Sequence, residues 1–299
     1  MSNAIETHGL RYRAGKTFEI RDLALNVPTG AVYGFLGPNG SGKTTTIRLL
    51  LGMLRRVGGT IRVLDGSVPR DIVHVLARVG YVPERPHLYP SLTVAEALRF
   101  HGAFFSRWDG HWADELRSGF GLDQDAKLSR LSKGEMGKLL VLVALAQRPD
   151  LLILDEPTDG LDPVVRRDVL AAVLEYVSTA RATVFISSHL VHELERICDW
   201  VGVMDHGQLV AELPMQTFKN GIKRLRVRNA PADIGDAPFV LLAREPGNGV
   251  AGESWVVRGW DASMHEYFTA IGAAVHAVDD LDLEDGFVEL LRASRAPTA

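Results

Sequence analysis

Apolar residues follow two alternating patterns in the first two thirds of the chain. Short continuous apolar runs at 31–36, 151–154 and 183–187 are typical of strands that are buried on both faces of a sheet. Elsewhere apolar positions recur every three or four residues, as at 43–54 and 190–200, and this spacing predicts helices. The alternation of strands with helices indicates an α/β domain around a largely parallel sheet.

Capping and turn residues add boundaries to this pattern. A helix is predicted to begin at Pro163 with Asp162 as its N-cap, because proline is favoured in the first turn of a helix. Thr93 and Glu96 have the spacing of a capping box and predict another helix start. Residues 201–210 predict a β-hairpin with glycine in its turn.

The pattern changes near residue 215. Beyond this point short strands alternate with loops that contain proline and glycine, and residues 220–299 hold 8 basic and 12 acidic residues, which accounts for the whole net charge of −4. We therefore expect two domains, 1–215 and 216–299, the second a small α+β unit. Its predicted elements are strands near 223, 239 and 254, a helix at 262–272, a strand near 274 and a last helix at 284–293.

The composition excludes several classes of protein. With 46% hydrophobic and 23% charged residues, the 299-residue chain has the composition of a globular protein. Its longest clean apolar run, 139–146, is far shorter than the roughly 20 residues of a spanning helix, and the first residues give no expectation of a signal peptide. A single cysteine, Cys198, excludes an internal disulfide and fits a reducing compartment. The pI of 6.2 gives no expectation of a nucleic-acid partner.

The strongest chemical motif is a glycine-rich segment between the strand at 31–36 and the helix that follows it. It matches the phosphate-loop pattern G-x-x-x-x-G-K-[ST], in which backbone N–H groups and a helix N-terminus point at phosphate. Lys43 would add a positive charge for the β- and γ-phosphates, and Thr44 a hydroxyl ligand for Mg²⁺. A glycine-rich turn without a ligand is the alternative, and the strand and helix on either side disfavour it. The candidate nucleotide-binding residues are Gly37, Pro38, Asn39, Gly40, Ser41, Gly42, Lys43, Thr44 and Thr45.

Two carboxylates follow the buried strand at 151–154. Ligands of α/β sheets gather at the carboxyl ends of strands, and adjacent side chains of a strand point to opposite faces, so Asp155 and Glu156 can take different roles. Asp155 is the candidate ligand of Mg²⁺. Glu156 is the candidate general base for a water molecule in line with the γ-phosphate.

These motifs, in kind and in order, resemble the ATP-binding subunit of an ABC transporter over about residues 3–212. The resemblance implies a P-loop NTPase core with a mostly parallel sheet, an N-terminal antiparallel β region and a helical subdomain at about 88–147, with ATP and Mg²⁺ as cofactors. The family's signature, usually LSGGQ, reads LSKGE at 131–135, where Ser132 and Gly134 match. The family places this segment against the γ-phosphate held by another subunit. Ser132 and Glu135 are also a capping box, and the two roles are compatible.

The resemblance implies further site residues. His189 matches the family's switch histidine and would join Lys43 and Glu156 as a catalytic residue. Asp162 lies in the segment that resembles the D-loop, which touches the partner subunit, and a local helix cap is an equal explanation of its side chain.

Two further positions involve an alternative or a departure from the family. Tyr12 lies where the family places an aromatic residue against adenine, with Phe18 as the competing candidate. Glu84 replaces the usual glutamine of the Q-loop and would either bind the metal more firmly or repel the γ-phosphate. Aromatic residues at 86–108 would either pack a small helical core or receive a segment of a membrane subunit.

The implied function is an ATPase that powers a separate membrane permease. The implied partners are this permease and a second copy or a similar ATPase in a head-to-tail dimer, which would place the chain in the cytoplasm at the inner face of the membrane. Glu84, the short signature and the C-terminal extension resemble ATPases of antibiotic, lipid or polysaccharide exporters, so export is expected. The alternative is an ATP-switched soluble regulatory module acting on nucleic acid or ribosomes. Every nucleotide motif precedes residue 216, so removal of 217–299 is expected to spare nucleotide binding.

Overall fold

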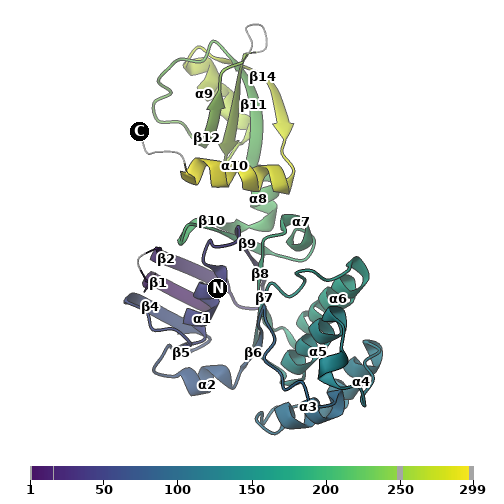
Figure 1. Ribbon diagram of the computed structural model, residues 1–299. Helices are drawn as coiled ribbons and strands as arrows, with labels where there is room; N and C mark the ends of the chain where they lie inside the picture. The colour runs from purple at the N-terminus through teal and green to yellow at the C-terminus, as the bar shows by residue number, and fades with distance from the viewer. Residues whose placement is uncertain (1, 16, 248–251, 296–299) are drawn as a thin grey trace.

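The computed structural model describes residues 2–15, 17–247 and 252–295 (Figure 1). The continuous apolar runs form the inner strands of a sheet with the order β10-β9-β3-β8-β7-β6. All neighbouring pairs are parallel except β9 and β10, which form the expected hairpin. The strands are β3 (Val32–Leu36), β6 (Val79–Val82), β7 (Leu151–Asp155), β8 (Thr183–Ser188), β9 (Trp200–Asp205) and β10 (Gln208–Pro214). The predicted mostly parallel sheet is confirmed.

A second, antiparallel sheet is formed by the N-terminal residues, in the order β2-β1-β4-β5. Helix α1 (Lys43–Leu50) lies between this sheet and the central one, and shares their apolar core. The strands are β1 (Asn3–Ala14), β2 (Phe18–Pro28), β4 (Gly58–Val63) and β5 (Gly66–Ser67), and the short helix α2 (Ile72–Leu76) follows them. The N-terminal antiparallel region is therefore confirmed as well.

Two helices are shorter than their apolar spacing predicts. Helix α1 ends at Leu50 rather than near residue 54, because Gly52 adopts a left-handed φ of 66° and the N–H of Met53 turns back to the carbonyl of Arg48. Helix α7 covers only Val191–Leu194 of the expected 190–200. The spacing of apolar residues indicates which side chains are buried, but it does not show how far the backbone hydrogen bonds of the helix continue.

The helical subdomain lies beside the central sheet and has a core of its own (Figure 1). Its helices are α3 (Val94–Gly102), α4 (Gly110–Gly119), the 3₁₀ turn η1 (Leu128–Arg130) and α5 (Lys133–Ala146), and α6 (Pro163–Ala180) packs against α5. The expected capping box of Thr93 and Glu96 is present at the start of α3. The aromatic residues of 86–108 are of two kinds. Trp108 packs into this core, whereas Tyr89 and Phe104 are exposed and contact Phe100 edge to face.

The C-terminal residues form a third sheet in the order β12-β13-β11-β14, joined to the hairpin β9–β10 by helix α8 (Met215–Gly221). Helix α9 (His265–Ala270) packs on one face of this sheet around the buried Trp255 and Phe268. The strands are β11 (Ile222–Arg228), β12 (Val240–Glu245), β13 (Glu253–Arg258) and β14 (Ala274–Asp280), and the last helix is α10 (Leu283–Arg295). The predicted α+β unit is confirmed.

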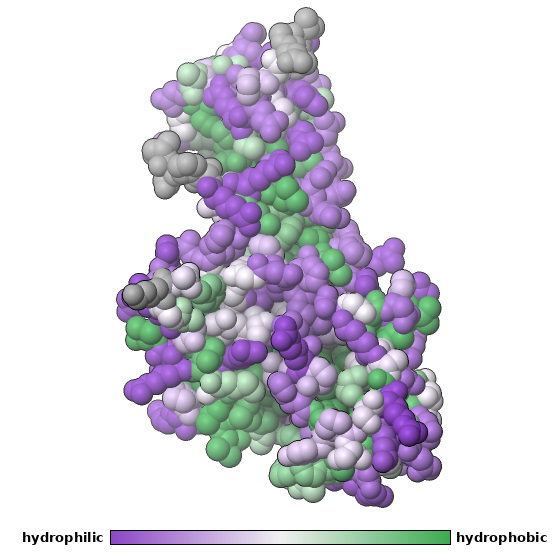
Figure 2. Space-filling model, viewed as in Figure 1, coloured by the Kyte–Doolittle hydropathy of each residue, from purple (hydrophilic) through white to green (hydrophobic). Residues whose placement is uncertain are grey.

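Helix α10 joins the C-terminal unit to the rest of the molecule. Its buried residues Phe287 and Leu290 belong to one continuous core with Leu194 of α7 and Val203 of β9. Figure 2 shows apolar side chains at the surface of the waist between the two lobes. The division into domains 1–215 and 216–299 stays a prediction. Because of this shared core, removal of 217–299 would expose apolar residues of the ATPase domain, so the removal would not leave this domain unaffected.

No helix in the described residues has the length and apolar character required to cross a membrane.

Candidate nucleotide-binding site

A pocket of about 420 Å³ opens where β3, β7 and β8 end. This is the size range of small-molecule sites, and the carboxyl ends of parallel strands are where α/β sheets bind ligands. The pocket collects residues from five of the motifs that the sequence singles out. Its lining in the described part of the chain is Phe18, Asn39, Gly40, Gly42, Lys43, Thr44, Thr45, Glu84, Glu156, Asp159 and His189.

The phosphate loop requires its glycines. A Cβ on Gly37 would lie 2.4 Å from the backbone oxygen of Met204, and Gly42 adopts a φ of 114°, which side chains rarely allow. The Ser41 hydroxyl is buried here without a hydrogen-bond partner in the structure. The loop is therefore tightly held, with an unused polar group at its centre, and this arrangement fits a phosphate ligand.

Lys43 is buried, with only 5% of its side chain exposed. Its ammonium donates to the carbonyl of Gly37 at 2.6 Å and lies 3.1 Å from Oε1 of Glu156. A buried cation between a phosphate loop and a carboxylate is placed to compensate the negative charge of a bound nucleotide.

Asp155 has the properties of a metal ligand. Its Oδ1 accepts hydrogen bonds from Ser187 at 2.8 Å and Thr44 at 3.2 Å, while its Oδ2 is buried and has no hydrogen-bond partner. Burial raises the pKa of Asp155 above its ordinary value, and the charges of Glu84 and Glu156 raise it further, against the hydrogen bonds of Ser187 and Thr44. A cation bound to Asp155 would stabilise the ionised carboxylate against burial and against the negative charges of Glu84 and Glu156, and would give Oδ2 a partner.

The protein ligands available here are few. Thr44 and Asp155 are in contact, and the described residues hold no group of three or more His, Cys, Asp or Glu side chains that could bind a metal by itself. Mg²⁺ usually takes one or two carboxylates, waters and substrate phosphates in such sites. The residues therefore fit Mg²⁺ that arrives with a nucleotide.

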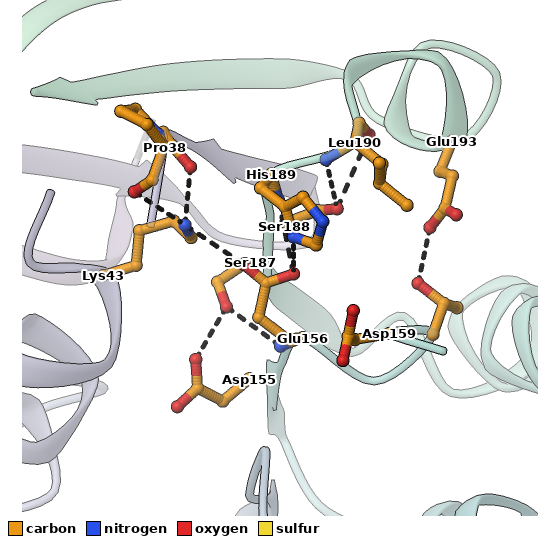
Figure 3. A network of polar contacts seen from close by, with 12 residues as sticks. Pro38, Lys43, Asp155, Glu156, Asp159, Ser187, Ser188, His189, Leu190 and Glu193 are labelled. Carbon is orange, nitrogen blue, oxygen red and sulfur yellow. Dashed lines mark hydrogen bonds and ion pairs between the residues drawn. The ribbon is translucent and has the colours of Figure 1, made fainter. Parts of the chain in front are cut away.

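Glu156 and His189 are held together beside Lys43, after the ends of β7 and β8 (Figure 3). Glu156 Oε2 lies 2.9 Å from His189 Nδ1 and accepts from the backbone N–H of His189 at 3.3 Å. Glu156 has a left-handed φ of 49°, and its own N–H donates to Ser187 Oγ at 3.1 Å. This turn aims the carboxylate at Lys43 and His189.

Ser132, Gly134 and Asp162 lie at the starts of α5 and α6 and do not line this pocket in the described part of the chain, and its lining also lacks Tyr12, Gly37, Pro38, Ser41 and Asp155. Ser132 caps α5 through the expected reciprocal capping box, in which it accepts from the N–H of Glu135 at 3.2 Å and its own N–H donates to the Glu135 side chain at 2.8 Å. Gly134 follows in the first turn of α5, against the side chain of Val165. Asp162 caps α6 by accepting from the N–H groups of the second and third helical residues. The local capping roles are confirmed.

The aromatic residue in the described lining of the pocket is Phe18, which lies within 2.8 Å of a Cβ built on Gly42. Tyr12 pairs with Ile20 in the same hairpin and packs against the core of the N-terminal sheet. Of the two candidates for contact with adenine, Phe18 is the better placed beside the phosphate loop. Glu84 lies in the pocket as predicted.

Three residues near the site were not found from the sequence. Ser187 orients Asp155 and the Glu156 backbone, and Asp159 lines the pocket and pairs with Lys133 of α5 at 3.6 Å. Glu193 is buried and connects α7 to Thr158 and Arg166. The tandem serines before His189 were a usable signal for Ser187, since they end a buried strand beside the one that carries Asp155.

Comparisons with known proteins agree with this geometry. Residues 20–159 match the family described as ABC transporter. The chain is 33% identical to the bacitracin transport ATP-binding protein of Enterococcus faecalis, with 97% of each chain covered. It is 38% identical to the daunorubicin/doxorubicin resistance ATP-binding protein of Streptomyces peucetius, over 77% of this chain and 72% of that one. A solved ATP-binding subunit of an ABC transporter has 26% identity and a TM-score of 0.65, covering 72% of this chain and 92% of its own.

The fold and the site thus define an ATP-binding α/β ATPase. The chain belongs to the ABC transporter family, as one of its ATP-binding subunits, in which ATP hydrolysis drives transport through a membrane permease. The comparisons do not favour the alternative of a soluble regulatory module.

Proposed function

We propose that this chain drives export, and that it does so as a head-to-tail dimer that encloses two ATP molecules. The proposed dimer rests on the observation that the nucleotide motifs lie in two separate places on the chain. The phosphate loop, Glu156 and His189 meet in one pocket, whereas Ser132 lies outside its described lining at the exposed start of α5. Each chain would then supply half of two sites, with Ser132 and its helix N-terminus facing the γ-phosphate held by the partner.

The residues of the pocket have separable roles in this proposal. Lys43 would bind the β- and γ-phosphates, and Glu156 would orient the attacking water and accept its proton. His189 would hold the Glu156 carboxylate in place through the 2.9 Å contact of its Nδ1. Thr44 and Asp155 would hold Mg²⁺, which supplies positive charge to the phosphate oxygens.

The dimer is tested by complementation. Ser132→Arg is expected to leave ATP binding to the single chain intact and to stop hydrolysis, because the bulky cation would block the partner's site. Mixing it with Lys43→Ala protein should restore hydrolysis, since the mixed dimer holds one complete site: the phosphate loop of the first variant and Ser132 of the second. ATPase activity is measured for each protein alone and for the mixture.

The matched control is Ser129→Arg, which adds the same side chain to an exposed serine of the 3₁₀ turn before α5. It should hydrolyse ATP at the wild-type rate. Loss of ATP binding in Ser132→Arg alone, or a mixture no more active than its components, would contradict the divided site.

Export rests on the two relatives, one named for bacitracin transport and one for daunorubicin/doxorubicin resistance. These names support an amphipathic antibiotic or a similar compound as the substrate class. The test uses inverted membrane vesicles that carry the chain and the permease that co-purifies with it, with bacitracin and daunorubicin as probes. We expect ATP-dependent accumulation inside these vesicles, and none with Glu156→Gln protein. ATP-dependent accumulation only in right-side-out vesicles loaded with ATP would indicate import and contradict the proposal.

A further inference from the structure

Residues of the last turn of helix α10 form hydrogen bonds with Asp205, the last residue of strand β9. Arg295 donates to Asp205 with both Nε, at 2.8 Å to Oδ2, and Nη2, at 3.0 Å to Oδ1. Ser294 Oγ donates to the same Oδ2 at 3.0 Å. Only 3% of the Asp205 side chain is exposed, so Ser294 and Arg295 donate the hydrogen bonds of a buried carboxylate, and the exposed His206 ring lies 3.8 Å from its Oδ1.

Asp205 begins the turn of the hairpin β9–β10, and this turn lies against the phosphate loop. The N–H of Gly207 donates to the carbonyl of Ser41 at 2.9 Å, and its own carbonyl accepts from Arg21 of β2 at 3.0 Å. A side chain on Gly207 would meet the Glu19 backbone, with a Cβ only 1.9 Å from its oxygen. The turn is therefore packed between β2 and the loop and cannot move independently of them.

A second contact comes from the residue before Asp205. The backbone oxygen of Met204 lies so close to Gly37 that a Cβ there would approach it to 2.4 Å. The thioether of Met204 lies 3.6 Å from the Thr46 hydroxyl, in the first turn of α1. The segment Met204–Gly207 thus touches the phosphate loop at its first glycine, at Ser41 and in the helix that follows.

We propose that Arg295 is a positioning residue for ATP binding, which acts through Asp205 and the β9–β10 turn on the phosphate loop. The C-terminal unit would thereby set the affinity of the ATPase for nucleotide, although it contributes no residue to the described lining of the pocket. Without Arg295, the buried Asp205 carboxylate keeps only the Ser294 hydroxyl and the exposed His206 ring, whose Nε2 lies 3.8 Å from Oδ1. Because the turn is packed against the phosphate loop, a shift of the turn would displace Ser41 and Gly37 with it. This inference concerns ATP binding alone and holds whether or not the chain drives export.

The charge state of Asp205 agrees with this role. Burial raises the pKa of this carboxyl, but the hydrogen bonds from Arg295 and Ser294, with the charges of His206 and Arg295, outweigh it and hold the pKa below its ordinary value. Asp205 is therefore ionised at neutral pH in its contact with Arg295.

The test compares four full-length proteins: wild type, Arg295→Ala, Arg295→Lys and Arg292→Ala. Arg292 is the matched control, because it lies on the same helix with the same charge but pairs with Glu289 at 3.1 Å. Equilibrium binding of a fluorescent ATP analogue gives Kd, and steady-state hydrolysis gives KM and kcat. Circular dichroism checks that each protein is folded.

Arg295→Ala is expected to raise Kd and KM for ATP at least about 5-fold, the lower end of ordinary coupling between sites, with kcat nearly unchanged. Arg295→Lys should recover part of the affinity, and Arg292→Ala should bind like the wild type. Ser294→Ala, which removes a single hydroxyl, should give a smaller shift in the same direction. Unchanged Kd in Arg295→Ala overturns the proposal, as does an equal rise in Arg292→Ala or a loss confined to kcat.

Discussion

Glu156→Gln is expected to lower the rate of ATP hydrolysis by about 10²–10⁴-fold, the usual contribution of a general base. Glutamine has the shape of glutamate but cannot accept the proton of the attacking water. The structure places Glu156 for this role, because its carboxylate is nearly buried in the pocket between Lys43 and His189. Binding of ATP should persist, since the substitution leaves the phosphate loop unchanged.

The same substitution should change the state of association. A dimer that encloses ATP brings the Glu156 carboxylate close to the γ-phosphate, and removal of one negative charge lowers this repulsion. Hydrolysis in the wild type would remove the γ-phosphate that bridges the two chains. We therefore expect the wild type to be mainly monomeric with ADP, and Glu156→Gln protein to accumulate as a dimer with ATP.

Size-exclusion chromatography with light scattering, run with ATP and with ADP, measures this difference. The matched control is Glu195→Gln, which neutralises a glutamate in the segment after His189 that pairs with Lys219 at 3.1 Å. It should hydrolyse ATP and dissociate as the wild type does. Wild-type hydrolysis by Glu156→Gln protein, or a monomer in saturating ATP, would remove Glu156 from its assigned role.

The sequence predicted the meeting of Lys43, Asp155 and Glu156 because strong local rules govern their placement, and the family resemblance added His189. Each follows a buried parallel strand, and the carboxyl ends of such strands meet at one edge of a sheet. The loop, its helix and the acidic strand end could therefore be placed in one site before any contact was known.

Contacts between distant segments could not be predicted in this way. Asp205 and Arg295 are 90 residues apart, and neither stands in a motif. Their contact depends on the position of α10 in the fold. That position is set by the packing of Phe287 and Leu290 in the shared apolar core, which no local sequence motif predicts. The choice between Tyr12 and Phe18 could not be made from the sequence for a related reason, since both lie in one hairpin and only the folded structure brings Phe18 into the described lining of the pocket.

Lys43→Ala should weaken binding of ATP by about 10²-fold or more, because hydrogen bonds to charged groups contribute about 1.5–3 kcal/mol each and this ammonium would serve two phosphates. Equilibrium titration with a fluorescent ATP analogue measures the loss. The matched control is Arg48→Ala, which removes an exposed cation from the same helix and should bind normally. Affinity of the wild-type order in Lys43→Ala would mean that the nucleotide binds elsewhere.

The ion pair of Lys43 with Glu156 means that Lys43→Ala changes two things at once, and a double variant at these two positions separates them. Removal of Lys43 leaves the Glu156 carboxylate, 10% exposed, facing the phosphates without a counter-charge, so part of the lost affinity could come from repulsion. The double variant Lys43→Ala/Glu156→Gln removes both charges together. If Lys43 binds the phosphates directly, the double variant stays at least about 10-fold weaker than Glu156→Gln alone, which corresponds to one charged hydrogen bond of about 1.4 kcal/mol or more. Equal affinity of these two proteins would show that Lys43 serves only to neutralise Glu156.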